Sequence, residues 1–132
     1  MPGYAYPVGA TASDVPAKTI TTVIASAGNN VTLFTATKKT RVNSILATNT
    51  SFGILPVRIF VDQGSGDKPL AYARVKNTNY IVAPLVSGDA RVAGFEGEAL
   101  TEFVLDIGDE LKASCPFADK VAITLNLSEG VK

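Results

Sequence analysis

The chain lacks histidine and tryptophan and has a single cysteine among its 132 residues. The absence of histidine excludes serine–histidine and cysteine–histidine catalysis, together with histidine-ligated zinc sites. Cys115 has no partner for an internal disulfide, which fits a reducing compartment. We interpret Cys115 as a small, half-buried apolar residue, because a nucleophilic thiol would need a basic partner.

The chain also lacks net charge, since twelve basic residues balance twelve acidic ones. A neutral chain does not indicate general binding to nucleic acid or to an anionic membrane. Its longest apolar runs are too short for a transmembrane segment, and residues 1–14 lack the features of a secretory signal. We therefore expect a soluble protein made in a cytoplasm, with neither nucleic acid nor membrane as a partner.

What the chain does have is alternation of apolar and polar residues, most clearly over Arg41–Asp62. Its second arm alternates Val57, Ile59 and Val61 with polar and aromatic residues, as in a strand with one face in a core. The first arm changes phase by one residue around Ser44, which indicates either a β-bulge or burial on both faces. A turn-forming segment, residues 49–53, separates the two arms.

Similar short strands fill the chain from Lys18 onward, and no window of ten residues sustains a helical apolar stripe. Further strands are predicted over Thr19–Ser26, Val31–Thr37, Leu70–Lys76, Asn79–Val86, Leu100–Ile107, Glu110–Cys115 and Lys120–Ser128, with Arg91–Glu98 irregular or an edge strand. The prediction is an all-β fold, an antiparallel β-sandwich or jelly-roll-like barrel of about eight to ten strands. The predicted core consists of Val42, Ile45, Val57, Ile59, Val61, Phe103, Leu105, Val121, Ile123 and Leu125.

Residues 1–17 differ from the rest, because three prolines interrupt any strand ladder and no periodicity is sustained. One interpretation is a frayed terminus. The other, which we favour, is an extended arm that lies on a neighbouring subunit and is anchored by Tyr4, Tyr6 and Pro7. We favour it because exposing large aromatic rings to water is energetically costly. Residues 18–132 then form a single β-sandwich domain.

Candidate chemistry is sparse, and we expect neither enzymatic activity nor a cofactor. Two carboxylates across a cleft can hydrolyse glycosides, but charged solvent faces are common and the chain has no tryptophan for sugar stacking. The Asp62–Asp67 loop offers oxygen ligands for a hard cation, although it lacks the carboxylate spacing of a calcium loop. Lys38, Lys39 and Arg41 are interpreted as a solvated turn. The acidic residues considered are Glu96, Glu98, Glu102, Asp106, Asp109 and Glu110.

Three motifs resemble small structural β-proteins of tailed-bacteriophage virions. They are a strand ending in Asn49 followed by Val57-Arg-Ile-Phe-Val-Asp62, the turn Leu105-Asp-Ile-Gly-Asp-Glu-Leu111, and a terminal strand from Val121 to Leu127 followed by Ser128-Glu129. The resemblance covers about residues 18–129. The long proline-bearing segment before it departs from the pattern and leaves the place in the particle open.

This resemblance implies a non-enzymatic virion protein assembled in the host bacterial cytoplasm. Its partners would be copies of itself and other virion proteins such as the major capsid protein, and its expected role is capsid decoration or cement. The alternatives are a neck, tail or fibre module, or a carbohydrate- or receptor-binding β-sandwich. The last would be favoured by exposed aromatic residues around one groove, whereas the aromatic residues here are scattered through the predicted strands.

Overall fold

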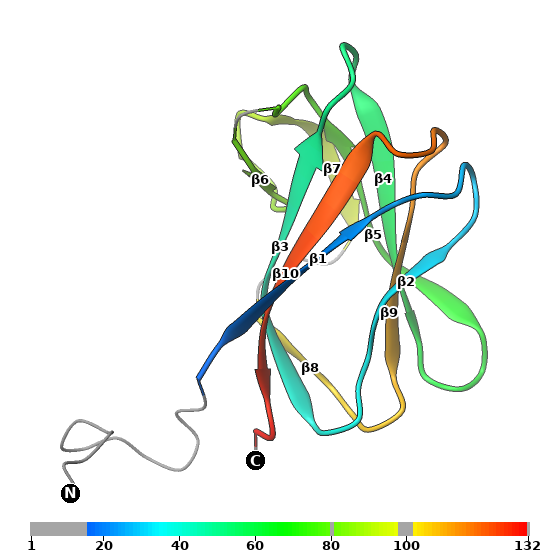
Figure 1. Ribbon diagram of the computed structural model, residues 1–132, viewed down its shortest axis with the longest axis vertical. Helices are drawn as coiled ribbons and strands as arrows, with labels where there is room; N and C mark the ends of the chain where they lie inside the picture. The colour runs from blue at the N-terminus through cyan, green and yellow to red at the C-terminus, as the bar shows by residue number, and fades with distance from the viewer. Residues whose placement is uncertain (1–15, 80, 98–101, 132) are drawn as a thin grey trace, which may run out of the picture.

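Ten strands form two five-stranded antiparallel sheets that face each other across a shared apolar core (Figure 1). The computed structural model describes residues 16–79, 81–97 and 102–131. Within these ranges there is no helix, and hence none long and apolar enough to cross a membrane. The predicted all-β sandwich is confirmed.

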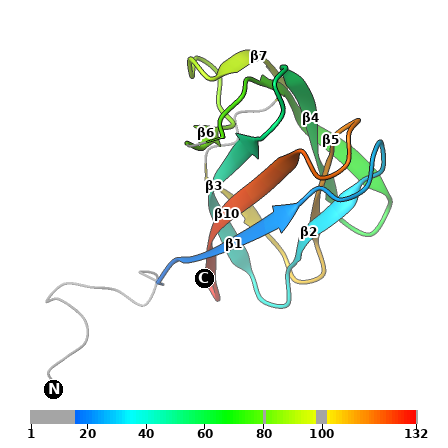
Figure 2. The same ribbon diagram turned by 45° about the horizontal axis from the view of Figure 1, so that its top comes forward.

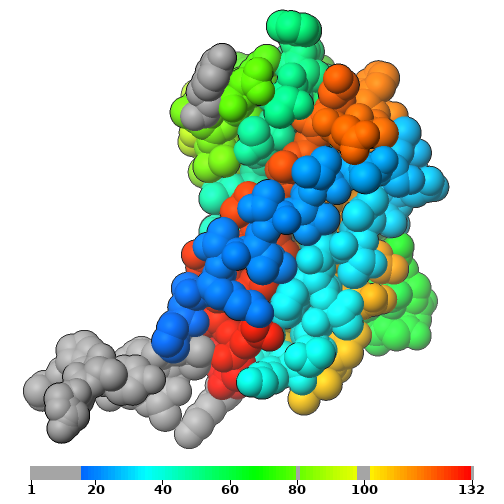
Figure 3. All heavy atoms as spheres, in the orientation of Figure 1, coloured from blue at the N-terminus to red at the C-terminus, as the bar shows by residue number. Residues whose placement is uncertain are grey.

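The first sheet has the order β1-β10-β3-β6, with β8 also paired to β3, and the second has the order β2-β9-β4-β5-β7. The edge strands β1 and β2 lie side by side along one flank of the sandwich (Figures 2 and 3). The strands are β1 (Lys18–Val23), β2 (Val31–Thr35), β3 (Thr40–Asn49), β4 (Leu55–Asp62), β5 (Asp67–Val75), β6 (Ala83–Pro84), β7 (Val92–Gly97), β8 (Phe103–Leu105), β9 (Glu110–Ser114) and β10 (Val121–Glu129).

The predicted change of phase in the first arm is a β-bulge in β3. Ser44 pairs with Asn126 and Val42 pairs with Leu127, so that Asn43 is the extra residue. The bulge turns both Val42 and Ile45 toward the core, which a regular strand would not do because side chains alternate between faces. The Asn43 side-chain amide donates hydrogen bonds to Asn126 Oδ1 and Ser128 Oγ at 2.9 and 3.0 Å, which ties the bulge to β10.

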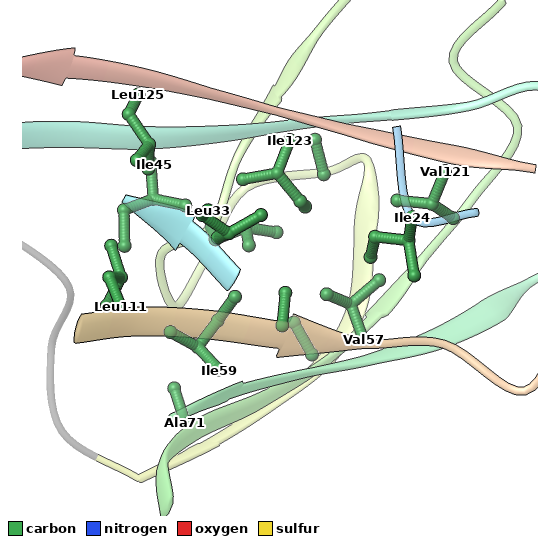
Figure 4. Close-up of a cluster of buried hydrophobic side chains, with 14 of the residues drawn as sticks. Ile24, Leu33, Ile45, Val57, Ile59, Ala71, Leu111, Val121, Ile123 and Leu125 are labelled. Atoms are coloured by element: carbon green, nitrogen blue, oxygen red, sulfur yellow. The ribbon is translucent and has the colours of Figure 1, made fainter. Parts of the chain in front are cut away.

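The core lies between the sheets and is formed by alternate residues of the long strands (Figure 4). Nine of the ten predicted core residues are buried, and Phe103 is half-buried and packs against them. Ile123 on β10 is fully buried. Cys115 is also fully buried rather than half-buried, and burial raises the pKa of its thiol.

Two predicted strands are short among the described residues. Within the described part of Asn79–Val86, the strand is the two-residue β6, in which Pro84 has no N–H to donate. Within residues 102–107, the strand is β8, and it ends at the turn that Gly108 and Asp109 close. Tyr80, Glu98 and residues 99–101 lie outside the described residues.

The Asp62–Asp67 loop connects the two strands of a β-hairpin, and both of its end residues belong to these strands. β4 continues to Asp62 and β5 begins at Asp67. Pro69 is accommodated in β5 because the register shifts at Leu70, and a bulge is one of the places where a sheet tolerates proline. The segment predicted as irregular or an edge strand is β7, which pairs with β5 and forms an edge of the second sheet.

Candidate interaction surfaces

The loop between β3 and β4 is held by the buried side chain of Asn49. The Asn49 amide donates to the carbonyl oxygens of Gly53 and Val75 at 2.9 and 2.7 Å. Its Oδ1 accepts hydrogen bonds from the backbone N–H and the hydroxyl of Ser51 at 2.9 and 2.8 Å. All of the polar atoms of this side chain are therefore engaged, and the loop is fastened to the end of β5.

Neighbouring segments brace the same loop from two sides. The Thr50 backbone N–H and hydroxyl both donate to the carbonyl oxygen of Lys120, in the connection between β9 and β10. On the other side, the Asn77 amide donates to the Ser51 carbonyl oxygen at 2.6 Å, and the Thr78 hydroxyl accepts from the Asn49 N–H at 2.7 Å. The loop is the uppermost part of the ribbon in Figure 1.

This braced loop carries Phe52, which is fully exposed, with a relative exposure of 102%. Other large apolar side chains are exposed at the last residue of this loop and on the β5–β6 and β9–β10 connections, which are hydrogen-bonded to it. We call this set the apolar loop end: Phe52, Ile54, Ile81, Val82 and Phe117. Exposed apolar clusters on a monomer mark contact sites, and a rigid aromatic side chain is a typical anchor of an interface.

A second feature is a groove on the outer face of the β2-β9-β4-β5-β7 sheet, with a volume of about 530 Å³. Arg58, Tyr72 and Glu96 lie directly opposite one another on β4, β5 and β7. The Arg58 guanidinium lies over the Tyr72 ring, 4.9 Å from its centroid. The remaining walls are largely apolar and include Phe60, Pro69 and Leu70.

The groove depends on a close approach of two backbones at Gly97. A Cβ atom at this position would lie 2.5 Å from the Leu70 carbonyl oxygen and 2.9 Å from the Ala71 Cα. Gly97 also has a φ of +106°, which residues with a side chain rarely adopt. β7 can therefore lie against the bulge of β5 only because residue 97 is glycine.

The predicted aromatic scatter is only partly found in the structure. Phe60 and Tyr72 come together in the groove, because β4 and β5 bring distant positions side by side. Phe95 and Phe103 instead pack against the core, and Phe52 stands at the apolar loop end. The alternation of side chains in the sequence predicts that Phe60 and Tyr72 both face outward. It does not predict that they lie close together, because this depends on which strands pair.

The carboxylates of the Asp62–Asp67 loop surround a lysine. Lys112 Nζ lies 2.8 Å from Asp67 Oδ1 and 3.7 Å from Asp62 Oδ2, and Glu110 Oε1 is 3.9 Å away. The hydrogen bond from Lys112 lowers the pKa of Asp67, with a further contribution from the Asn30 amide. The backbone N–H groups of the loop glycines also donate to Asp62. This arrangement is an ion-pair cluster in which the lysine takes the place that a cation would occupy.

The other acidic and basic candidates are dispersed. Glu96 lines the groove, Glu102 lies 3.6 Å from Arg41, and Asp109 accepts a hydrogen bond from the Asp106 N–H. Lys38 and Lys39 are exposed on the turn between β2 and β3, as predicted, whereas Arg41 belongs to β3 and is half-buried. Within the described ranges, no three histidine, cysteine, aspartate or glutamate residues are grouped so that they could hold a metal ion.

β1 is an edge strand of the first sheet and pairs with β10. The Ile24 N–H donates to the Val121 carbonyl oxygen at 2.8 Å. Because antiparallel strands bond through alternate residues, Thr22 and Ile20 also face β10, and the backbone groups of Thr21 and Val23 point away from it. Among the described residues, no strand other than β10 pairs with β1, and such an edge can accept another strand.

No family model and no curated protein matches the chain. Solved structures similar to it include two of a pentameric capsid protein isolated from metagenomic phage sequences. In each, the identity is 20%, the TM-score is 0.40 and 86% of this chain is covered. The alignment covers 67% of one of these chains and 59% of the other, which is less than two thirds of the latter's length. At this level of similarity, neither a common fold nor a common function is assigned.

Proposed function

We propose that the protein is a non-enzymatic structural component of a tailed-bacteriophage virion, a capsid decoration or cement protein that acts through protein–protein contacts. The observation that carries this proposal is the apolar loop end. Phe52 is fully exposed on a loop fastened by a buried asparagine, so its ring is not buried against the described residues of its own chain. The resemblance of the strand and turn motifs to small virion proteins supports the same role.

The physical case rests on preorganisation. Burying an exposed phenylalanine side chain stabilises a complex by about 1.5–3 kcal/mol. A loop that is already fixed loses little conformational entropy on binding, so most of this gain is kept. A decoration protein repeats such a contact many times over a shell, and a modest free energy at each site then stabilises the particle.

Self-association is the second part of the proposal. Residues 1–17 act as an arm that reaches a neighbouring subunit, with Tyr4, Tyr6 and Pro7 as its anchors, while residues 18–132 form the single folded domain. The position of the arm immediately before the edge strand β1 supports this arrangement. The protein works in the virion after assembly in the host bacterial cytoplasm, and a neck, tail or fibre position uses the same contacts.

The groove provides a second candidate from another class, a carbohydrate- or receptor-binding sandwich. Two aromatic residues, Phe60 and Tyr72, meet there beside an arginine and a glutamate. Apolar and aromatic side chains combined with a few polar groups are the usual lining of a small-ligand site. A glycan array that retains the wild-type protein but not a Tyr72→Ser variant would favour this candidate.

The decoration role is tested by adding purified protein to shells that lack it and measuring the bound mass by sedimentation. Phe52→Asp should reduce binding at least tenfold, because a buried phenylalanine contact is replaced by a charge in an apolar interface. Ile107→Asp is the matched control, since Ile107 is also an exposed apolar residue but lies on the turn between β8 and β9. Equal binding by the two variants would contradict the proposal.

A further inference from the structure

We propose that the groove formed by Arg58, Phe60, Leu70, Tyr72 and Glu96 receives the Tyr4–Pro7 segment of a second copy of this chain. This inference rests on the proposed role of residues 1–17 as an arm and identifies the surface that receives it. The groove lies on the outer face of the second sheet, whereas the described chain begins beside β1, at the edge of the first.

The chemistry of the two partners matches. Residues 1–13 contain no charged side chain and include two tyrosines and two prolines. The groove is lined by the apolar residues Phe60, Pro69 and Leu70 and by the charged residues Arg58 and Glu96. Proline-containing segments dock in aromatic-lined grooves because their extended conformation is already formed, and the tyrosine hydroxyls can reach polar groups at a rim.

A sugar suits the same surface less well. Saccharides bind through the open face of an aromatic ring, but the Arg58 guanidinium already lies over the Tyr72 ring. The walls at Phe60, Pro69 and Leu70 supply area rather than hydrogen bonds. A peptide can bury its tyrosine rings and proline against these apolar residues without displacing the Arg58 guanidinium from the Tyr72 ring.

A second copy is a better donor than the chain's own arm. The fifteen residues before Pro16 span at most roughly 50 Å when extended. To enter its own groove, the Tyr4–Pro7 segment would have to pass from the β1 edge of the first sheet around the flank of the sandwich to the outer face of the second sheet, with only residues 8–15 before the described chain. If each copy gives its arm to the next, the contact is head-to-tail, and it closes into a ring when the rotation permits.

The test uses three full-length variants, Tyr4→Ser/Tyr6→Ser in the arm, Tyr72→Ser in the groove, and Arg74→Ser as control. Arg74 is exposed on the same strand and face but does not line the groove. Sedimentation velocity should show at least a tenfold loss of association for the arm and groove variants and none for Arg74→Ser. An equimolar mixture of the arm and groove variants should form a mixed dimer, because one intact arm then meets one intact groove.

A second measurement needs no substitution in the fold. A synthetic peptide of residues 1–15, in excess, should dissociate wild-type oligomers, while the same peptide with both tyrosines replaced by serine should not. Failure of the peptide to compete would contradict the inference even if Tyr72→Ser had unfolded the groove.

The remaining outcomes separate the inference from the function on which it rests. One outcome is that the arm variant fails to associate, while neither Tyr72→Ser nor the peptide weakens association. The arm then binds elsewhere, such as the β1 edge, and only the inference fails.

Another outcome is that the equimolar mixture of the arm and groove variants forms no dimer. The arm then lies in the groove of its own chain, and the inference that it enters a second copy is wrong. If only the groove variant dissociates, the groove takes another segment. If all variants associate like the wild type, or the wild type is a monomer, the proposed arm fails as well.

Discussion

The two ends of the sandwich are built from the same strands but differ in chemistry. At one end, the connections carry exposed Phe52 and Phe117 and are cross-bonded through Asn49 and Thr50. At the other end, the turn between β2 and β3 carries Lys38 and Lys39, and the turn between β8 and β9 exposes one large apolar residue, Ile107. The exposed Phe52 and Phe117 therefore lie on connections that the Asn49 and Thr50 side chains bond to neighbouring segments.

The sharpest contrast lies in how the turns are held. The end with Ile107 is held by backbone bonds, such as Gly108 N–H to the Ala36 carbonyl oxygen at 2.7 Å, and by the buried side chains of Asp109 and Thr40, which bond within their own turns. At the apolar loop end, the buried Asn49 side chain bonds to two carbonyl oxygens, one of which, that of Val75, belongs to another strand. A buried polar side chain is costly unless all of its hydrogen bonds are made, so this one specifies a single loop conformation.

Ile123→Ala should have the largest effect, because the shared core supports both ends alike. Lost burial and the remaining cavity should lower the free energy of unfolding by about 2–4 kcal/mol. Chemical denaturation checks this, and hydrogen exchange should accelerate at both ends together. A change below ~0.5 kcal/mol would mean that the phase of β10 is not the one described.

Asn49→Ala should separate the two ends. Removal of the amide leaves the Gly53 and Val75 carbonyl oxygens without these donors, which should cost about 1–3 kcal/mol. Hydrogen exchange should accelerate in residues 50–54 and stay unchanged in the turn that contains Gly108. Asn29→Ala is the control, because the Asn29 amide bonds to Ser26 Oγ in an exposed position. Equal exchange effects at both ends would contradict the role given to Asn49.

Gly97→Ala should alter the groove, which lies away from both sets of turns. The positive φ alone should cost about 1–2 kcal/mol, and the contact with the Leu70 carbonyl oxygen should displace β7. Gly88→Ala provides a control with a φ of +92° and no atom within 4 Å of the added Cβ. Thermal unfolding of the two variants compares strain with and without the backbone contact, and an equal loss would show that the contact is unimportant.

Acid should have the smallest effect, and it should act on two carboxylates. Hydrogen bonds from Arg91 lower the pKa of Asp89 from 3.8 to about 2, and the hydrogen bond from Lys112 lowers the pKa of Asp67. A lowered folded pKa means that stability is present above the unfolded pKa and is lost as pH falls through the folded one. Asp89→Asn should therefore be less stable than wild type at pH 7, and the difference should shrink between about pH 4 and pH 2 in urea titrations. A difference that does not change with pH would contradict this assignment.

Much of the fold could be predicted from alternation alone, since nine of the ten proposed core residues are buried and the phase change at Ser44 is a bulge. Two predicted strands are short among the described residues. Asn79–Val86 contains Pro84, and within residues 102–107 the strand ends at Leu105, although Phe103, Leu105 and Ile107 share the same parity. Alternation reports which face a residue takes, but it does not report whether a partner strand is within reach.

The surfaces were harder to predict because they are assembled from separate strands. Phe60 and Tyr72 come together because β4 pairs with β5 in a particular register. Gly97 lies against the bulge at Leu70 because β7 pairs with β5. The buried position of Asn49 could have been predicted from the sequence. It shares the parity of the buried Ala47, and an inward-facing asparagine at the end of a strand predicts a buried hydrogen-bond network. The anchors Tyr4, Tyr6 and Pro7 lie outside the described residues and stay a prediction.

The most direct test of the central claim, that the apolar loop end is the contact surface, is hydroxyl-radical footprinting of the free protein and of the protein bound to particles. Mass spectrometry would measure oxidation of Phe52, Phe117 and Ile107, which are all exposed in the free chain. We predict that Phe52 and Phe117 are protected at least fivefold on the particle, while Ile107 is oxidised at its original rate. Protection of Ile107 with unchanged oxidation of Phe52 would contradict the account.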